Sequence, residues 1–318
     1  MIQCLRAGIL ALILAGLAIL PAAGQSTKLK DGFEGTDFAP EGGLYYRENE
    51  EQMAGSIKFQ HDVVFAGKGA LELSVRPLCI IEDDGCSERA EIWEKTAFRV
   101  PYDQGVWFGF AVKMADPIPA DDHRYLIAQW KREIDHGADG DFSPFLALRL
   151  LNGKLHVTVE TNYKPGLDGA KPAGPGQCSP GGVPVWLRPE TNQMRALVAA
   201  DPNWEPQDGT LYADCTDRIT VKQHNPLPAP NSGWIDFVVY SHPGPRGDGR
   251  IELFANGKPI VTVTGMIGHG DKDLGKNQYF KFGPYRAGHS GDWTVYYDQF
   301  RRSPDCADVL VGSPCPQF

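Results

Sequence analysis

The sequence predicts an all-β protein, a single-domain β-sandwich of the jelly-roll type with a long Pro/Gly-rich insertion. Short segments that alternate apolar and polar residues follow one another, and few stretches have a helical period. The chain has 36 glycines and 25 prolines, which are typical of turns between short strands. Of its 318 residues 42% are hydrophobic, which is enough for the core of one large all-β domain. Many short strands with few helices favour a two-sheet sandwich.

The first residues have the pattern of a signal peptide. Arg6 precedes an apolar run over residues 7–20, and the small residues of PAAGQ follow it. The run has about 14 residues, fewer than the ~20 that a spanning helix needs, so a membrane anchor is the less favoured alternative. We assign residues 1–24 to the signal peptide and 25–318 to the mature domain. The protein is therefore expected to be secreted or periplasmic, without a membrane anchor after cleavage.

Period-two alternation places the strands. Residues 65–77 put three aliphatic side chains on one face and polar side chains on the other. The other strands are expected over residues 31–38, 43–48, 87–100, 105–114, 124–131, 233–242, 277–286 and 293–302.

Two hairpins and one insertion complete the series. Hairpins are expected over residues 144–160 and 249–265, because each contains an Asn-Gly pair that favours a tight turn. Residues from about 163 to 232 are rich in proline and glycine and longer than an ordinary connection. We expect an irregular insertion here, which forms an ordered functional loop or a lid.

Cysteine usage agrees with export. Of seven cysteines, Cys4 lies in the signal, and an even number after a signal peptide implies disulfides. Six cysteines allow 15 pairings, and their order along the chain favours the local one: Cys79–Cys86, Cys178–Cys215 and Cys306–Cys315.

The charge and the motifs exclude several classes of function. A net charge of −9 disfavours nucleic-acid binding, and an anionic ligand needs a local basic cluster. The chain lacks a C-x-x-C pair, a G-x-S-x-G elbow, an H-E-x-x-H pair and a phosphate loop. We predict no cofactor and no catalytic metal. A structural calcium ion at the acidic residues 135–141 or at Asp298 is the alternative to a solvated turn and a cap.

Polar side chains recur at i, i+2 spacing on three of the predicted strands, where they share a face. They are Arg89 with Glu91, Gln129 with Lys131, and Tyr279 with Lys281 and Tyr285. If the three strands are neighbours, these residues form a basic patch that suits an anionic, hydroxyl-rich ligand. Each pair alone is also compatible with an ordinary solvated face.

The order of these motifs resembles the jelly-roll polysaccharide lyases. R-x-E at 89–91, Q-x-K at 129–131 and YFKFGPYR at 279–286 follow the pattern of alginate, glucuronan and heparin lyase I families. GRIELFANGKPI, which begins at Gly249, and VYYDQFRR, which begins at Val295, make the heparin lyase I-like branch the most similar one. The resemblance covers roughly residues 31–162 and 233–302.

The resemblance implies a β-elimination of a uronate-containing polysaccharide. Gln129 and Arg89 are expected to neutralise the uronate carboxylate, which makes the C5 proton more acidic. Tyr285 is expected to protonate the O4 leaving group and to take the C5 proton. Lys281 lies beside it and favours its phenolate, while Glu91 orients Arg89. Tyr279 and Arg286 complete the substrate-binding set that the resemblance implies.

One position departs from the family pattern. Many of these lyases carry a histidine two residues after the glutamine, where this chain has Lys131, which by its position joins Tyr285, Gln129 and Arg89 in the expected catalytic set. A free lysine titrates near ~10.4 and is a poor base at neutral pH unless it is desolvated. Three interpretations follow: Tyr285 acts alone as base and acid, a loop histidine serves as base, or the site binds without cleaving. The candidate histidines are His136, His123 and His289.

Two functions from other classes stay open. A jelly roll of this kind can bind carbohydrate without catalysis, in the same groove. A glycoside hydrolase needs two facing carboxylates, and Glu88 and Glu94 lie on the strand face opposite to Glu91. The sequence thus predicts an acidic polysaccharide as the partner, with no nucleic acid, and specifies neither the polymer nor an oligomeric state.

Overall fold

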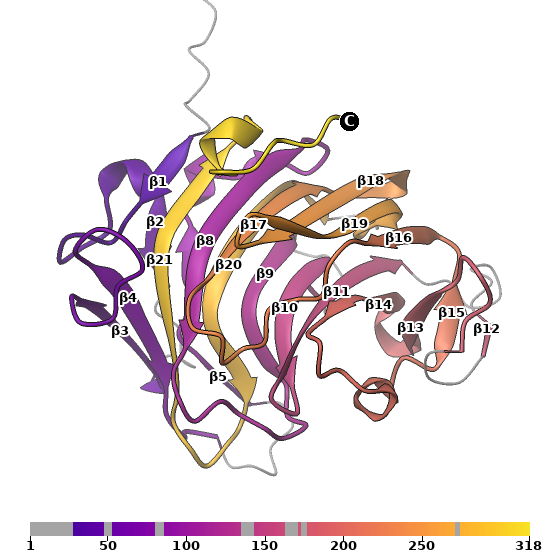
Figure 1. The fold of residues 1–318 in the computed structure, drawn as a ribbon, viewed down its shortest axis with the longest axis horizontal. Helices are drawn as coiled ribbons and strands as arrows, with labels where there is room; N and C mark the ends of the chain where they lie inside the picture. Colours follow the sequence, from indigo (N-terminus) through magenta and orange to yellow (C-terminus); the bar gives the residue numbers. More distant parts are fainter. Residues whose placement is uncertain are drawn as a thin grey trace, which may run out of the picture.

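Two antiparallel sheets form the fold in the computed structural model, which describes residues 28–47, 53–79, 86–134, 143–162, 171–172, 177–270 and 274–318 (Figure 1). The nine-stranded sheet has the order β16-β19-β18-β17-β8-β21-β4-β3, and β1 pairs with β21. Its strands are β1 (Leu29–Asp31), β3 (Gly55–Gln60), β4 (Ala70–Val75), β8 (Val106–Met114), β16 (Ile219–Gln223), β17 (Ile235–His242), β18 (Gly244–Ala255), β19 (Lys258–Ile267) and β21 (Trp293–Ser303).

The twelve-stranded sheet has the order β12-β15-β13-β14-β11-β10-β9-β20-β6-β2, and β5 and β7 also pair with β20. Its strands are β2 (Leu44–Tyr46), β5 (Ser87–Arg89), β6 (Ile92–Glu94), β7 (Val100–Pro101), β9 (Tyr125–Ile134), β10 (Leu146–Leu151), β11 (Lys154–Asn162), β12 (Lys171–Pro172), β13 (Val183–Arg188), β14 (Gln193–Ala200), β15 (Asp214–Thr216) and β20 (Leu274–Ala287). Short 3₁₀ turns are η1 (Pro40–Gly42), η3 (Thr96–Phe98), η4 (Pro189–Thr191), η5 (Pro206–Gly209) and η6 (Cys306–Asp308).

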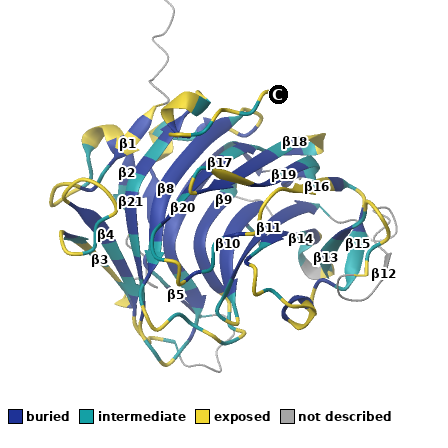
Figure 2. Ribbon diagram, viewed as in Figure 1, coloured by how far each residue is buried: buried dark blue, intermediate teal, exposed yellow. Residues whose placement is uncertain are grey.

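The core fills the space between the two sheets. Phe108 and Phe110 of β8 meet Phe280 and Phe282 of β20, with ring centroids 5.2 to 6.3 Å apart, and Trp130 of β9 packs among them. Figure 2 shows the central strands of both sheets buried over most of their length. The alternation of the sequence produces this arrangement, because every second side chain of each strand enters the core. The predicted jelly-roll sandwich is confirmed.

A smaller apolar cluster lies on the far side of the nine-stranded sheet. Trp107 and Phe254 pack there against Val309 and Leu310 of the C-terminal segment. The disulfide Cys306–Cys315 closes that segment into a loop. Cys79–Cys86 and Cys178–Cys215 form as well, so the predicted pairing is confirmed.

The prediction of an irregular insertion over 163–232 was wrong. Its described residues include the strands β12 to β16, of which four extend the twelve-stranded sheet beyond β11 and one joins the edge of the other sheet. Prolines and glycines concentrate in the connections, and they hid the alternation of the segments 183–188 and 193–200.

The first predicted strand was also misplaced. β1 covers only Leu29–Asp31, and the chain then turns at Phe33, which has a positive φ of 55°. The Asp31 carboxylate accepts the backbone N–H groups of Phe33 and Ala39 and stabilises the turn.

Some predictions concern residues outside the described ranges. These are the signal peptide at 1–24, the acidic segment 135–141 and His136. The ranges that are described contain no helix with the length and apolarity to cross a membrane.

Candidate active site

β20 lies at the centre of the candidate site, between β9 on one side and β5, β6 and β7 on the other. Phe280 and Phe282 point into the core, so Tyr279 and Lys281 point to the opposite face of the sheet, here called the outer face. Lys281 is directly opposite Gln129 of β9 and Trp93 of β6. The condition set for the polar patch is therefore met, because the three strands that carry it are adjacent.

A β-bulge at Gly283 brings Tyr285 into the site. Three steps along β20, from Phe282 to Tyr285, match two steps along β9, from Ala128 to Leu126. Gly283 has a φ of 128°, and a Cβ atom there would lie 2.0 Å from the carbonyl oxygen of Ala90. Glycine is therefore required for β20 to pass the segment between β5 and β6.

Glu91 connects the polar residues of the site. Its Oε1 accepts a hydrogen bond of 2.5 Å from Gln129 Nε2, and its Oε2 lies 2.9 Å from Lys281 Nζ. An Arg89 guanidinium nitrogen lies 3.7 Å from the same Oε2. Glu91 is 2% exposed, so a single buried carboxylate orients three groups rather than Arg89 alone.

Lys281 is buried at the centre of this cluster. Its Nζ lies 4.3 Å from the ring centroid of Trp93 and 5.9 Å from that of Tyr285. Burial lowers the pKa of Lys281 to about 8; the charges of Lys131 and Arg89 also lower it, while Glu91 raises it. The ammonium is therefore close to its titration point in the mildly alkaline range.

Tyr285 is half-buried and surrounded by cations. It pairs with Arg89 across β20 and β5, and the Arg89 guanidinium lies 4.2 Å from its ring centroid. The guanidinium of Arg124, an exposed residue just before β9, lies 4.8 Å from the same ring. With Lys281, three positive groups lie around the ring of this one tyrosine.

Tyr279 and Lys131 lie side by side at one border of this cluster. They are directly opposite each other on β20 and β9. The Tyr279 ring is stacked on Trp93 at 5.5 Å and covered by Arg99 at 4.4 Å, and burial raises its pKa. Both predicted residues therefore lie on the outer face, next to Lys281 and Gln129.

Arg286 does not join the other predicted residues. It is opposite Tyr125, a core residue, and its Nε donates to Glu88 Oε2 at 2.6 Å. Arg286 is 1% exposed. Its position directly after Tyr285 sends it to the core face, where it has a structural partner.

The described histidine candidates lie around Asp121. His123 Nδ1 is 2.9 Å from Asp121 Oδ1, and His289 Nε2 is 3.1 Å from Asp121 Oδ2. Tyr125 donates its hydroxyl to the same carboxylate, and hydrogen bonds hold the pKa of Asp121 below its usual value although burial opposes this. Through Asp121, the two imidazoles connect the loop before β9 with the loop after β20.

A second charged cluster lies on the outer face of the same sheet. The sequence analysis did not identify its four residues. Glu160 of β11 accepts a hydrogen bond of 2.5 Å from Arg195 Nε and lies 3.7 Å from a nitrogen of Arg149. Burial, together with the charge of Arg195, lowers the pKa of Arg149. Tyr212, which is 5% exposed, interacts with all three charges, and burial raises its pKa.

The insertion covers this second cluster. The Trp204 ring packs on His156 of β11 at 5.0 Å, and Asp208 binds Lys154 Nζ at 2.7 Å. Burial lowers the pKa of His156 to about 3, so its ring is neutral. The segment 201–212 therefore acts as a fixed cover over β10 and β11.

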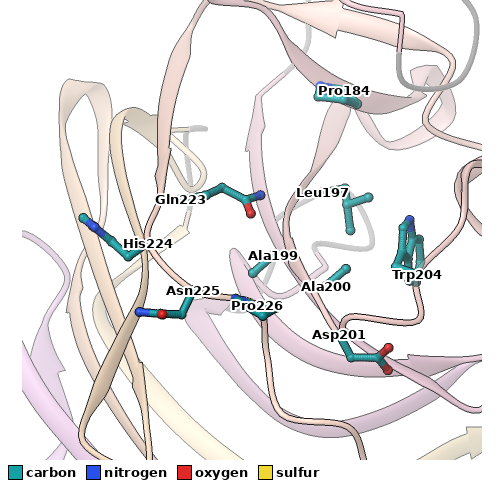
Figure 3. Close-up of a pocket in the computed structure, with 10 residues that line it drawn as sticks. All are labelled: Pro184, Leu197, Ala199, Ala200, Asp201, Trp204, Gln223, His224, Asn225 and Pro226. Atoms are coloured by element: carbon teal, nitrogen blue, oxygen red, sulfur yellow. The ribbon is translucent and has the colours of Figure 1, made fainter.

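A pocket of about 490 Å³ opens at the end of β14 beside this cover (Figure 3). Trp204 forms one wall, and Gln223, His224 and Asn225 face it from the other side. Alanines and Leu197 form the floor. The pocket contains no arrangement of cations and tyrosine like that around Tyr285, within the residues that line it.

In the structure, the side chain of Asp298 caps backbone N–H groups, which was one of its two predicted roles. Its carboxylate accepts the backbone N–H groups of Phe65, Ala66 and Gln299. Nowhere in the described ranges do three or more His, Cys, Asp or Glu side chains form a group that could hold a metal ion.

Comparisons with known proteins bear on the family and the fold of this chain. A family model described as polysaccharide lyase matches residues 36–301. The crystal structure of an endo-β-1,4-glucuronan lyase from the fungus Trichoderma reesei is similar at a TM-score of 0.56 and 16% identity, over 90% of this chain and 98% of that one. A search among curated proteins gave no match.

Two other structures are more distant. A cellulose-induced protein aligns at a TM-score of 0.46 and 14% identity, over 87% of this chain and 97% of that one. An alginate lyase in complex with dimannuronate aligns at 0.41 and 12%, over 74% of each chain. The heparin lyase I-like branch is singled out by none of these matches and stays a prediction.

Proposed function

The chain belongs to the polysaccharide lyase family, and from this premise we propose that it cleaves a uronate-containing polysaccharide by β-elimination at Tyr285. The observation that carries the proposal is the cluster on the outer face of β20. There, Arg89, Arg124 and Lys281 surround one phenol, and one glutamate binds both that lysine and a glutamine. In a chain of net charge −9, such a local positive site selects an anionic ligand.

The first role we propose is neutralisation of the uronate carboxylate. Gln129 uses one N–H of its amide for Glu91 and has a second N–H to donate to the substrate. Arg89, 17% exposed at its side chain, adds a positive charge on the same side. Both groups stabilise the negative charge that spreads into the carboxylate when C5 loses its proton.

The second role we propose is proton transfer by Tyr285. As a phenolate it takes the proton from C5, and the electron pair of that bond forms the C4–C5 double bond. The C4–O4 bond breaks, and the same phenol returns the proton to O4. Tyr285 ends the cycle as a phenolate, as it began. One fragment of the polymer then ends in an unsaturated uronate and the other in a hydroxyl group.

Lys131 is assigned to substrate binding rather than to proton transfer. It lies opposite Tyr279 on the outer face, and its charge contributes to lowering the pKa of Lys281. His123 and His289 are engaged with Asp121, which supports the interpretation that Tyr285 acts alone. Elimination on one side of the sugar ring, as in glucuronate or mannuronate, fits a single residue in both roles.

The fold supports glucuronan as the first polymer to test. The fungal structure, whose alignment covers 90% of this chain, is that of an endo-β-1,4-glucuronan lyase with a similar fold. The three disulfides support the proposed export through the signal peptide at 1–24.

The decisive experiment incubates the mature protein with glucuronan, polymannuronate, polyguluronate, hyaluronan and heparin. We expect a rise in the ultraviolet absorbance of the unsaturated uronate with at least one polymer. New reducing ends without this absorbance would indicate a hydrolase. Binding without new ends would indicate a carbohydrate-binding protein with no catalysis.

A further inference from the structure

A pocket of about 410 Å³ adjoins the candidate active site at the β6 side of β20. Trp93 and Tyr279 form its aromatic wall, and Arg47, Arg99, Glu133 and Ile134 complete the lining. Trp93 is also the direct neighbour of Lys281 across the two strands. Trp93 therefore belongs both to the pocket and to the surroundings of Lys281.

The pocket lies one strand spacing from the catalytic cluster. Neighbouring strands are ~4.8 Å apart, and Tyr279 is two residues, or ~7 Å, from Lys281 along β20. A polymer whose carboxylate binds at Gln129 would therefore place an adjacent sugar near Trp93 and Tyr279. The rings of Trp93 and Tyr279 stack on each other, with Arg47 and Lys281 over Trp93 and Arg99 over Tyr279, so they position the cations of the pocket and leave no free ring face.

The charges of the pocket favour an acidic sugar. Arg99 is committed, because it forms an ion pair of 2.9 Å with Glu133, which also accepts a hydrogen bond of 2.8 Å from Asn277. Arg47 is exposed, and its guanidinium lies 4.6 Å from the ring centroid of Trp93. A guanidinium stacked on an aromatic face keeps its N–H edge available for a carboxylate, which it can bind with two hydrogen bonds.

The lining thus has two arginines and one glutamate, an excess of one positive charge. Within the described part of the chain, Arg47 forms no ion pair with an acidic side chain. The exposed Ile134 at the rim offers an apolar contact for the ring carbons. Together these groups provide one directed cation, an apolar rim and little else that would bind a neutral sugar tightly.

We propose that this pocket is a subsite that recognises the carboxylate of a second uronate, next to the one that is cleaved, through Arg47. The proposal rests on the proposed function and deepens it, since it requires consecutive acidic sugars in the substrate. A polymer with isolated uronates between neutral sugars is then a poorer ligand.

The test measures binding without turnover, in the Tyr285→Phe background, by isothermal titration calorimetry. The ligands are hexasaccharides of β-1,4-glucuronate and of β-1,4-mannuronate, and the carboxyl-reduced glucuronate hexasaccharide. The variants compared are Arg47→Gln and, as a matched control, Arg246→Gln, which removes another exposed guanidinium, from the irregular part of β18 between Gly244 and Gly249.

We expect Arg47→Gln to weaken binding of at least one acidic hexasaccharide about tenfold, as the loss of a charge-assisted hydrogen bond does. Arg246→Gln should leave the affinity unchanged, and the reduced hexasaccharide should not distinguish the variants. The proposal is overturned if Arg47→Gln behaves like Arg246→Gln, if it weakens acidic and reduced ligands equally, or if neither acidic ligand binds.

These outcomes are separable from a failure of the proposed function. If binding depends on Arg47 but the parent protein forms no unsaturated product from any polymer, the elimination is wrong and the subsite stands. If the parent protein cleaves and Arg47→Gln changes nothing, the elimination stands and the subsite is wrong.

Discussion

Two clusters on the same face of the twelve-stranded sheet are built from the same kinds of residues. Around β20, Glu91 holds Lys281 and Gln129 and approaches Arg89, with Tyr285 beside them. Around β11, Glu160 binds Arg195 and approaches Arg149, with Tyr212 beside them. Each has a buried glutamate, two cations and a tyrosine.

The difference lies in the tyrosine. Tyr285 is half-buried between exposed and partly exposed cations, whereas Tyr212 is buried and burial raises its pKa. The segment 201–212 also covers the second cluster, and Arg195 packs against the ring of Trp186 at 5.0 Å. The same residue types thus form a candidate catalytic site where solvent has access, and a structural anchor where a loop excludes it.

Substitution of the tyrosine in each cluster should give the largest difference between the two clusters. Tyr285→Phe should lower kcat by about 10³-fold, because it removes the proposed acid and base while keeping the ring. Tyr212→Phe should leave kcat within about twofold. The measurement is the initial rate of ultraviolet absorbance on the polymer that the parent cleaves. Comparable losses in both variants would contradict the assignment of the site to β20.

Substitution of Gln129 should have the next largest effect on kcat. Gln129→Leu should lower kcat about 10²-fold, since one donor to the developing carboxylate charge is lost. The matched change is Thr158→Val, which removes the acceptor of Arg149 Nε in the covered cluster. Steady-state kinetics should show no change in kcat for that variant. A Gln129→Leu enzyme of normal kcat would exclude Gln129 from carboxylate neutralisation.

For the free energy of unfolding, in contrast to kcat, we expect the larger effect at the covered cluster. Glu160→Gln should reduce the free energy of unfolding by about 3 kcal/mol, because it leaves two buried guanidinium groups without their counter-charge. Glu72→Gln, at an exposed pair 3.7 Å from Lys58, should cost less than about 1 kcal/mol. Urea unfolding followed by fluorescence measures both. If Glu160→Gln stays fully stable but loses activity, the second cluster takes part in the reaction.

The pH dependence gives the smallest and most specific effect. Lys281, with its pKa lowered to about 8, is protonated below that pH and neutral above it. If its charge supports elimination, kcat should fall about tenfold per pH unit above pH 8. Lys281→Arg should move this decline to higher pH, because a guanidinium keeps its proton. A decline that stays at the same pH in Lys281→Arg would assign it to another group.

Part of the site could be predicted from local pattern alone. The faces of Arg89, Glu91, Gln129 and Lys281 follow from period-two alternation, which is a property of the strand itself. The excess of small turn residues and the order of the six later cysteines likewise indicated the sandwich and its disulfides. These features need no knowledge of which strands are neighbours.

Other parts depended on contacts between distant segments. Arg124 faces Tyr285 only because β9 pairs with β20, and the stacking of Arg47 on Trp93 requires β2 to pair with β6. The alternation of β13 and β14 was present in the sequence, but the prolines and glycines around them concealed it. When turn residues are counted over a long segment, short strands between the turns are not detected.

The sequence by itself determined most strands outside residues 163–232, their apolar faces, the disulfide pairs and the polar residues around β20. Only the tertiary structure decided that Glu91 joins three groups, that Arg286 pairs with Glu88, and that segment 201–212 covers the second cluster. The physical reason is range. Alternation is set by the backbone of one strand, whereas register, bulges and solvent access are set by segments far apart in the sequence, such as Glu88 and Arg286 at a separation of 198 and Phe65 and Asp298 at 233.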